Sequence, residues 1–159
     1  MRIRVLCIGK LKERFYVDAA LEFQKRLSRY ASVELVELAD ARAPEHLSAA
    51  QREQVKSEEG QRLLARVDEG DFLVALDQRG QELASEELAA QLQSWMNAGK
   101  SRIAFAIGGS LGHGQEVLRR ADFRLSFGKP TFSHQIFRIM LLEQIYRAFK
   151  ILHGEPYHK

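Results

Sequence analysis

The sequence predicts an α/β fold with a parallel β-sheet, and the order of its segments supports this class. Short apolar runs rich in β-branched and aromatic residues alternate with longer segments of helical period. Strands that alternate with helices in this way are typical of βαβ units, whose strands pair in parallel. Because no linker, repeat or low-complexity tract divides the 159 residues, we expect one domain over residues 1–159.

Five apolar runs are the expected strands of this sheet. They are "IRVLCIG" (3–9), "VELVEL" (33–38), "FLVALD" (72–77), "RIAFAIGG" (102–109) and a short "FRLSF" (123–127). Their lengths and their content of Val, Ile, Leu and Phe suit strands that are buried on both faces.

Four segments between and after these runs are the expected helices: 13–30, 45–67, 85–97 and 133–152. The first places Phe15, Phe23 and Leu27 on one stripe, and the second follows Pro44 and is heavily charged. The third begins at Ser85 with an acidic first turn, which is typical of a helix N-terminus.

The last expected helix is apolar on far more than one stripe. Between Ser133 and Leu152 the apolar residues cover most of its circumference. Such a helix must be buried on most sides, so we expect it to pack on its own sheet and on a second subunit of a two-fold homodimer. A helix that is simply central to its own core is the alternative.

The composition, with 45% hydrophobic and 28% charged residues, is that of a soluble globular protein. No run approaches the roughly 18 apolar residues that a membrane span needs, and the first residues lack the pattern of a secretory signal. The single cysteine, Cys7, lies in an apolar run and is expected to be a buried structural thiol. We therefore expect a cytoplasmic protein without a membrane partner.

Charge is distributed unevenly along the chain. Residues 1–30 carry 8 basic and 3 acidic residues, residues 31–128 carry 11 and 16, and residues 129–159 carry 5 and 2. A positive surface where the two ends meet would suit a polyanion such as RNA. Ordinary solvated surface charge explains the same counts equally well.

Three segments follow expected strands, where open α/β sheets bind ligands. They are "VALDQRG" with Leu76, "FAIGGSLGHG" with Gly108 and Gly109, and "LSFGKPTFSHQ" from Leu125 to Gln135. The glycine spacing matches neither the dinucleotide-binding motif nor the P-loop, and a purely structural turn remains open.

The third segment has the clearest ligand-binding features. Gly128, Lys129 and Pro130 form a rigid polar loop, and Thr131 or Ser133 can cap the helix that follows. Such a crevice offers amides and carbonyls to an adenine edge and a carboxylate, with apolar walls for the ring.

The histidines and carboxylates indicate neither a metal site nor covalent catalysis. No His, Cys or carboxylate spacing fits a metal, and no Ser/His/Asp or Cys/His set is present. His134 could contact a ligand or satisfy nearby backbone groups, and His46 is expected on the surface. The roles of His113 and His153 stay open.

Four stretches together resemble one known family. They are "IRVLCIGKLKERF", "VALD", "FAIGGSLG" and "LSFGKPTFSHQIFRIMLLEQIYRAFKILHGEPYHK". They resemble the RlmH family, the bacterial large-subunit ribosomal RNA (23S rRNA) pseudouridine N3-methyltransferases of the SPOUT superfamily. The resemblance spans the whole chain.

This resemblance implies a parallel-sheet SPOUT fold with a C-terminal trefoil knot, a rare feature among folds. It implies S-adenosyl-L-methionine as cofactor, bound by Leu76, Gly108, Gly109, Phe127, Gly128, Lys129, Pro130, Thr131 and Phe132. It also implies a homodimer that methylates large-subunit ribosomal RNA within the assembled ribosome, with the tail of one subunit reaching the cofactor pocket of the other.

The expected reaction is attack by the N3 atom of a pseudouridine on the sulfonium methyl group in one in-line displacement. An imide nitrogen is a poor nucleophile until it loses its proton, and nearby cations favour the anion. Arg138, His158 and Lys159 are the candidate groups, and Tyr157 is available to stack on a base. His158 is the residue that we expect to accept the proton.

The loop before the last helix departs from the family pattern. Where relatives commonly have a serine, an apolar residue and a proline, this chain has Gly128, Pro130 and Ser133. Any contact that relatives make through the serine side chain is lost at Gly128. An RNA-binding or ribosome-associated homodimer without catalysis is therefore the alternative function, and a nucleotide-binding protein of another reaction class is disfavoured by the absent phosphate motifs.

Overall fold

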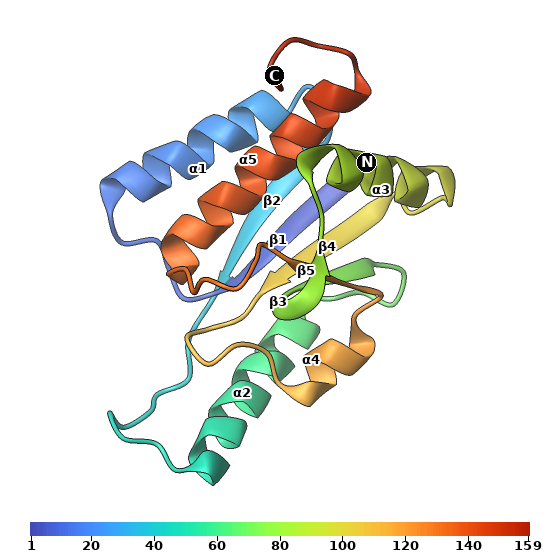
Figure 1. Ribbon diagram of the computed structural model, residues 1–159. Coiled ribbons are helices and arrows are strands. Elements are labelled where there is room, and N and C mark those ends of the chain that lie inside the picture. Colours follow the sequence, from blue (N-terminus) through green and yellow to red (C-terminus); the bar gives the residue numbers. More distant parts are fainter.

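The computed structural model describes residues 1–159 and contains a five-stranded sheet between two layers of helices (Figure 1). The strands are β1 (Arg2–Ile8), β2 (Ser32–Leu38), β3 (Phe72–Glu82), β4 (Arg102–Ile107) and β5 (Phe123–Ser126). Their order is β2-β1-β4-β3-β5, and every neighbouring pair is parallel. The predicted α/β class with a parallel sheet is confirmed.

The helices are α1 (Arg14–Leu27), α2 (Ala49–Leu64), α3 (Ser85–Asn97), α4 (Gln115–Arg120) and α5 (His134–Leu152). Figure 1 shows α1, α3 and α5 on one face of the sheet and α2 and α4 on the other. The four predicted helices are present; α3 has the predicted bounds, and the other three are shorter. Helix α4 was not predicted, because six residues are too few to show a helical period.

Capping explains one of the shortened helices. Ser48 accepts a hydrogen bond from the Gln51 amide, and the Gln51 side chain accepts one from the Ser48 amide. This capping box begins α2 at Ala49 rather than at residue 45 as predicted. Residues 39–48 therefore form a loop without regular structure.

Strand β3 is longer than the sequence indicated, and the prediction that it ends at Leu76 and Asp77 was wrong. Its pairing with β5 shifts register between Leu76 and Gln81 and then resumes. Gly80 permits this, since a Cβ atom there would lie 2.7 Å from the carbonyl carbon of Arg124. Leu76 and Asp77 therefore lie at an irregularity within the strand.

Two apolar clusters form the core, one on each face of the sheet. Side chains of β1 alternate between them: Val5 and Cys7 face the α1/α3/α5 layer, and Leu6 and Ile8 face the α2/α4 layer. Burial raises the pKa of the Cys7 thiol to about 12, so it stays protonated at neutral pH. This agrees with the buried structural thiol that was predicted.

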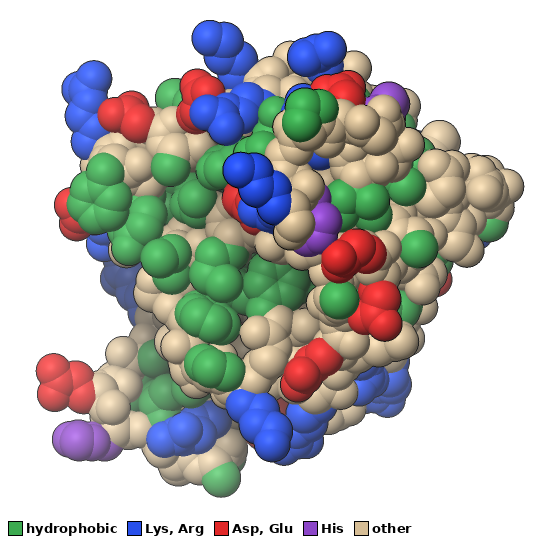
Figure 2. Space-filling model, turned by 45° about the horizontal axis from the view of Figure 1, so that its top comes forward, with side chains coloured by type: hydrophobic (Ala, Val, Ile, Leu, Met, Phe, Trp, Pro, Cys, Tyr) green, Lys and Arg blue, Asp and Glu red, His purple; other side chains and the backbone are tan.

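Helix α5 buries one broad face and leaves another apolar face uncovered. Leu141, Leu142 and Ile145 are fully buried against the sheet layer, whereas Ile136 is 42% exposed. Phe15 and Leu21 of α1 are also exposed, and Figure 2 shows apolar side chains gathered over this α1/α5 face. The subunit that would cover this face stays a prediction.

No helix combines the length and the apolar composition that crossing a bilayer requires.

Candidate functional site

The three ligand-binding segments expected from the sequence meet at one edge of the sheet. Leu76 pairs with Ile107 of β4 on one side and with Leu125 of β5 on the other. The glycine loop that follows β4 and the loop that follows β5 therefore flank Leu76. Together these segments contain every predicted cofactor-binding residue.

The glycine loop, residues 108–114, is shaped by close packing. A Cβ atom on Gly108 would lie 2.9 Å from the carbonyl carbon of Gly112, and one on Gly109 would lie 2.5 Å from the Oε2 atom of Glu59. The Gly112 amide donates to the Gly109 carbonyl at 3.0 Å, and Gly112 has a φ of +80°. Side chains at 108 and 109 are thus excluded by backbone and by a buried carboxyl group.

Three buried polar atoms beside this loop have no hydrogen-bond partner: Oε2 of Glu59, Oδ2 of Asp77 and Nδ1 of His113. The Nε2 atom of His113 lies 3.1 Å from the Ala106 carbonyl, so this nitrogen carries the proton and Nδ1 is left as an acceptor. Burial lowers the pKa of His113 and keeps it neutral. Unpaired buried groups of this kind are uncommon and fit a site that receives a ligand.

The loop from Phe127 to Phe132 is held against β3 by Gln78, a residue that the sequence did not single out. The Gln78 Nε2 atom donates to the carbonyls of Lys129 (3.2 Å) and Pro130 (3.3 Å) and lies 3.2 Å from Oγ1 of Thr131. Gly128 has a φ of +99°, which favours glycine. The only sequence signal that could have identified Gln78 was its position directly after Asp77.

Ser126 fixes the start of the same loop. Its hydroxyl accepts from the Gly128 amide at 3.1 Å and donates to the Gln78 carbonyl at 3.2 Å. At the other end, Phe132 stacks on Phe137 of α5 with ring centroids 5.8 Å apart. Ser133 caps α5 by accepting from the Ile136 amide, so of the two predicted caps it is Ser133 that acts.

A cavity of about 700 Å³ adjoins this loop. Its lining includes Phe127 and Gly128 from the loop, Leu83 from the β3–α3 connection, and Ile139 and Met140 from α5. Apolar side chains predominate in this lining, which suits a flat ring. Of the predicted cofactor-binding residues only Phe127 and Gly128 line the cavity, and the glycine loop does not.

The predicted catalytic residue Arg138 lies away from this cavity and is fully buried. Its guanidinium group donates to the carbonyls of His134 (3.0 Å) and Gly9 (3.2 Å) and to Oε1 of Glu37 (3.3 Å). It therefore ties the first turn of α5 to the ends of β1 and β2. The ring of His134 lies against Gly9, and burial and the neighbouring Arg138 lower its pKa.

The predicted catalytic tail folds back on its own subunit. The Tyr157 hydroxyl donates to Oε1 of Glu143 at 3.0 Å, and the Arg147 guanidinium lies 4.7 Å from the centre of the Tyr157 ring. Nε2 of His158 lies 2.8 Å from Oε1 of Glu86, and Nδ1 of His158 lies 3.3 Å from Arg147. Lys159 is exposed. The structure thus brings Tyr157 and His158 together but not with Arg138.

The turn that leads to the tail is also anchored. Gly154 has a φ of +63°, which ends α5, and Glu155 accepts a hydrogen bond from the Tyr30 hydroxyl at 2.8 Å. Glu155 also forms an ion pair with Lys150, which lowers the pKa of the Glu155 carboxyl group. The tail is therefore an ordered part of the α1/α3/α5 layer.

No group of three His, Cys, Asp or Glu side chains is arranged to hold a metal ion.

Comparison with known proteins identifies relatives over the full length. Residues 1–158 match the family model described as "Predicted SPOUT methyltransferase". A protein of Acetivibrio thermocellus named "Ribosomal RNA large subunit methyltransferase H" is 49% identical over 159 residues, and a protein of Bifidobacterium animalis subsp. lactis with the same name is 52% identical. Each alignment covers 100% of both chains.

Among solved structures, a similar one is described as "a probable methylase family protein from Haemophilus influenzae Rd KW20". The TM-score is 0.55 at 15% sequence identity, and the alignment covers 99% of this chain and 70% of that one. At this identity the likeness supports the fold.

Proposed function

Because the chain belongs to the SPOUT methyltransferase family, we propose that it transfers a methyl group to N3 of a pseudouridine in large-subunit ribosomal RNA. The names of relatives that are about half identical over their full length support ribosomal RNA as the substrate. The pseudouridine N3 atom and the assembled ribosome rest on the resemblance of the sequence motifs to the RlmH family.

The observation that carries the proposal is the convergence of Leu76, the glycine loop and the Phe127–Phe132 loop at one sheet edge. S-adenosylmethionine would supply an electrophilic methyl group there. The loop carbonyls, Oδ2 of Asp77 and Nδ1 of His113 are acceptors for its amino groups. Leu76 lies between the two loops, and Phe127 is an apolar wall for the ring. Gly108 and Gly109 allow close approach of the backbone.

The chain's own contribution is to align the two reactants and to favour the anionic base. In the proposed homodimer the tail of one subunit serves the site of the other. Nε2–H of His158 faces Glu86 and Nδ1 faces Arg147, so His158 must leave Arg147 before its Nδ1 atom can accept the imide proton. Tyr157 keeps its proton at neutral pH, because burial and Glu143 raise its pKa, and it can stack on the base.

Arg138 has a positioning role in this proposal. Its charge is fully buried and faces Glu37, Gly9 and His134, so it holds α5 and hence the loop before it. Lys159 and the unpaired lysines near the start of the chain, Lys10 and Lys12, are cations that RNA phosphates could meet.

The decisive test is mass spectrometry of large-subunit RNA from cells that lack the protein. We expect the loss of one methyl group on a pseudouridine, restored by the wild-type gene and not by Gly108→Ala, whose new Cβ atom would press on Gly112. The matched control is Gly99→Ala. Gly99 has a positive φ, which by itself strains an alanine, but a Cβ atom there meets nothing within 4 Å and the residue lies at the opposite end of β4 from the glycine loop, so this variant should restore methylation.

Unchanged methylation in the deletion strain would refute the proposed reaction. Calorimetry of the purified protein with S-adenosylmethionine separates the enzyme from a non-catalytic RNA-binding dimer. The proposal requires that wild type and Gly99→Ala bind S-adenosylmethionine with measurable heat. Gly108→Ala should bind it at least tenfold more weakly.

A further inference from the structure

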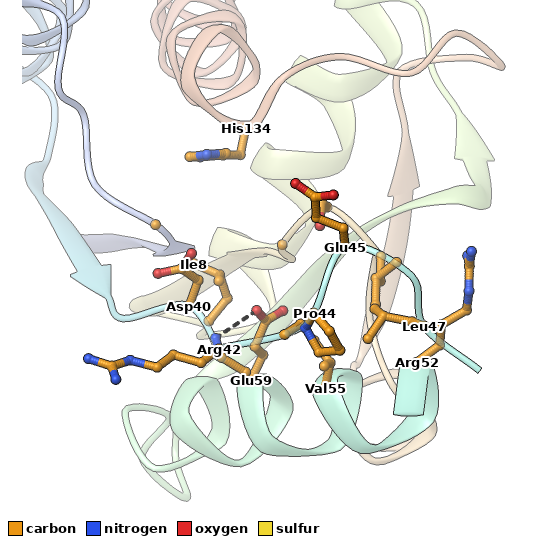
Figure 3. Close-up of a pocket in the computed structure, with 16 residues that line it drawn as sticks. Ile8, Asp40, Arg42, Pro44, Glu45, Leu47, Arg52, Val55, Glu59 and His134 are labelled. Carbon is orange, nitrogen blue, oxygen red and sulfur yellow. Dashed lines mark hydrogen bonds between the residues drawn. The ribbon is translucent and has the colours of Figure 1, made fainter. Parts of the chain in front are cut away.

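A second cavity, of about 750 Å³, lies at the carboxyl ends of β1, β2 and β4 (Figure 3). It is enclosed by the end of β1 at Gly9, the 39–48 loop, helix α2, the glycine loop and His134. The adjacent strands β1 and β4 lead to connections on opposite faces of the sheet, and open α/β sheets bind ligands at such a point. Of the predicted cofactor residues, only Gly109 lines this cavity.

The 39–48 loop is irregular but is held in place over the cavity. The Ala39 carbonyl accepts from Nη1 of Arg62 at 2.7 Å, and the Ala41 amide donates to Oε1 of Glu59 at 3.1 Å. Ser48 ends the loop by capping α2. Long loops without regular structure in a compact domain are mostly functional, and this one is fixed on both sides of its exposed residues 42–46.

Glu59 places an unpaired acceptor at the cavity. The residue is only 5% exposed, and its Oε2 atom is buried without a hydrogen-bond partner. Figure 3 shows its carboxylate directed from α2 into the cavity. A buried oxygen of this kind is stabilised by a ligand N–H group, and the edges of nucleobases carry such groups.

The rim of the cavity carries unpaired cations. Arg42 and Arg52 are exposed, form no ion pair and extend outward on opposite sides of the cavity in Figure 3. Lys10 and Lys12, which follow Gly9, are likewise exposed and unpaired. The buried carboxyl group of Glu59 makes the interior unsuitable for a phosphate, so phosphates would remain at the rim.

We propose that this cavity binds one unpaired nucleotide of the RNA substrate. The base enters between Pro44, Leu47 and Val55 with an N–H group toward Glu59, and the flanking phosphates meet Arg42 and Arg52. The glycine loop separates the cavity from the cofactor site, so this nucleotide is a neighbour of the methylated one. The inference rests on the proposed function and adds a substrate contact to it.

The test is steady-state methylation of ribosomes that lack the methyl group, at saturating S-adenosylmethionine. We expect the double variant Arg42→Gln/Arg52→Gln to raise the KM for ribosomes at least tenfold with kcat within twofold of wild type. Glu59→Gln, which keeps the acceptor for the Ala41 amide, should raise the KM at least threefold. The matched control is Arg66→Gln, an exposed and unpaired arginine just past the far end of α2, which should leave the KM unchanged.

A second readout does not depend on turnover. Ultraviolet crosslinking of the protein to ribosomes, followed by peptide mass spectrometry, should place crosslinks within residues 39–48, and the double variant should lose them. A KM for the double variant equal to that of Arg66→Gln, or crosslinks confined to the tail, would overturn the inference. If wild type does not methylate at all, the proposed function fails, and crosslinks within residues 39–48 would still support the nucleotide site.

Discussion

At the scale of single residues, the glycine loop and its neighbours combine backbone that cannot carry side chains with polar atoms that lack partners. Gly109 is fixed by the Oε2 atom of Glu59, and Gly108 is fixed by the backbone of Gly112. Nε2–H of His113 donates to the Ala106 carbonyl, and its Nδ1 atom is an acceptor without a partner. Each of these features costs stability in the free protein, which is common where a site is built for a ligand.

His113 makes stability depend on pH in a predictable direction. Burial lowers its pKa below 6.5, so between its folded pKa and 6.5 the unfolded chain binds more protons. Its contribution to the free energy of unfolding is therefore present above pH 6.5 and is lost as the pH falls, by at most about 1.4 kcal/mol per pH unit. Urea unfolding of wild type and His113→Gln at pH 5 to 7 should show a smaller rise with pH in the variant.

The comparison isolates His113 because other titrating groups are common to both proteins. The pKa of His134 is also lowered by burial, so the free energy of unfolding of the variant should still rise with pH, although less steeply. Identical pH slopes for the two proteins would show that His113 is protonated equally in the folded and unfolded states.

At the scale of elements, hydrophobic period located all five strands and four of the five helices. The extension of β3 beyond Asp77 could not be predicted, because it depends on the approach of Gly80 to β5, a contact distant in sequence. For the same reason the sequence indicated neither the burial of Arg138 nor the role of Gln78, since their partners lie on other strands and loops. The convergence of the loops after β4 and β5 was predictable, since parallel strands share their carboxyl edge, whereas Leu76 lies beside them within β3 and not at its end.

The C-terminal tail is an element whose function and stability can be separated. Deletion of residues 157–159 removes the contacts with Glu143 and Glu86 but leaves the buried face of α5 intact. We expect methylation of ribosomes to be lost, with the circular dichroism spectrum and most of the cofactor affinity retained. Tyr157→Phe, which keeps the ring and loses the hydroxyl, is the control for stacking and should retain more activity than the deletion. Full activity of the truncated protein would refute the role of the tail.

At the scale of the whole molecule, the two layers of helices differ in what they leave exposed. The α2/α4 side carries the unpaired Arg42 of the 39–48 loop and the unpaired Arg52 of α2, whereas the α1/α5 side carries Phe15, Leu21 and Ile136. A charged side suits RNA, and an apolar side suits another protein surface. The trefoil knot stays an expectation from the family resemblance.

The apolar α1/α5 face leads to a prediction about assembly. We expect light scattering at micromolar concentration to give the mass of a dimer, and Ile136→Glu to raise the dimer dissociation constant at least tenfold, which corresponds to about 1.4 kcal/mol. The reason is that a charge would have to be buried, unpaired, among apolar side chains of the partner.

Ala50→Glu is the matched control for this prediction. It introduces the same charge at an exposed position in the first turn of α2, on the opposite layer, where the helix dipole favours an acid. This variant should remain dimeric.

Since the tail of one subunit is proposed to serve the site of the other, Ile136→Glu should also lose methylation at concentrations where it is monomeric and regain it when the concentration is raised. A monomeric mass for wild type would contradict both the dimer and the shared site.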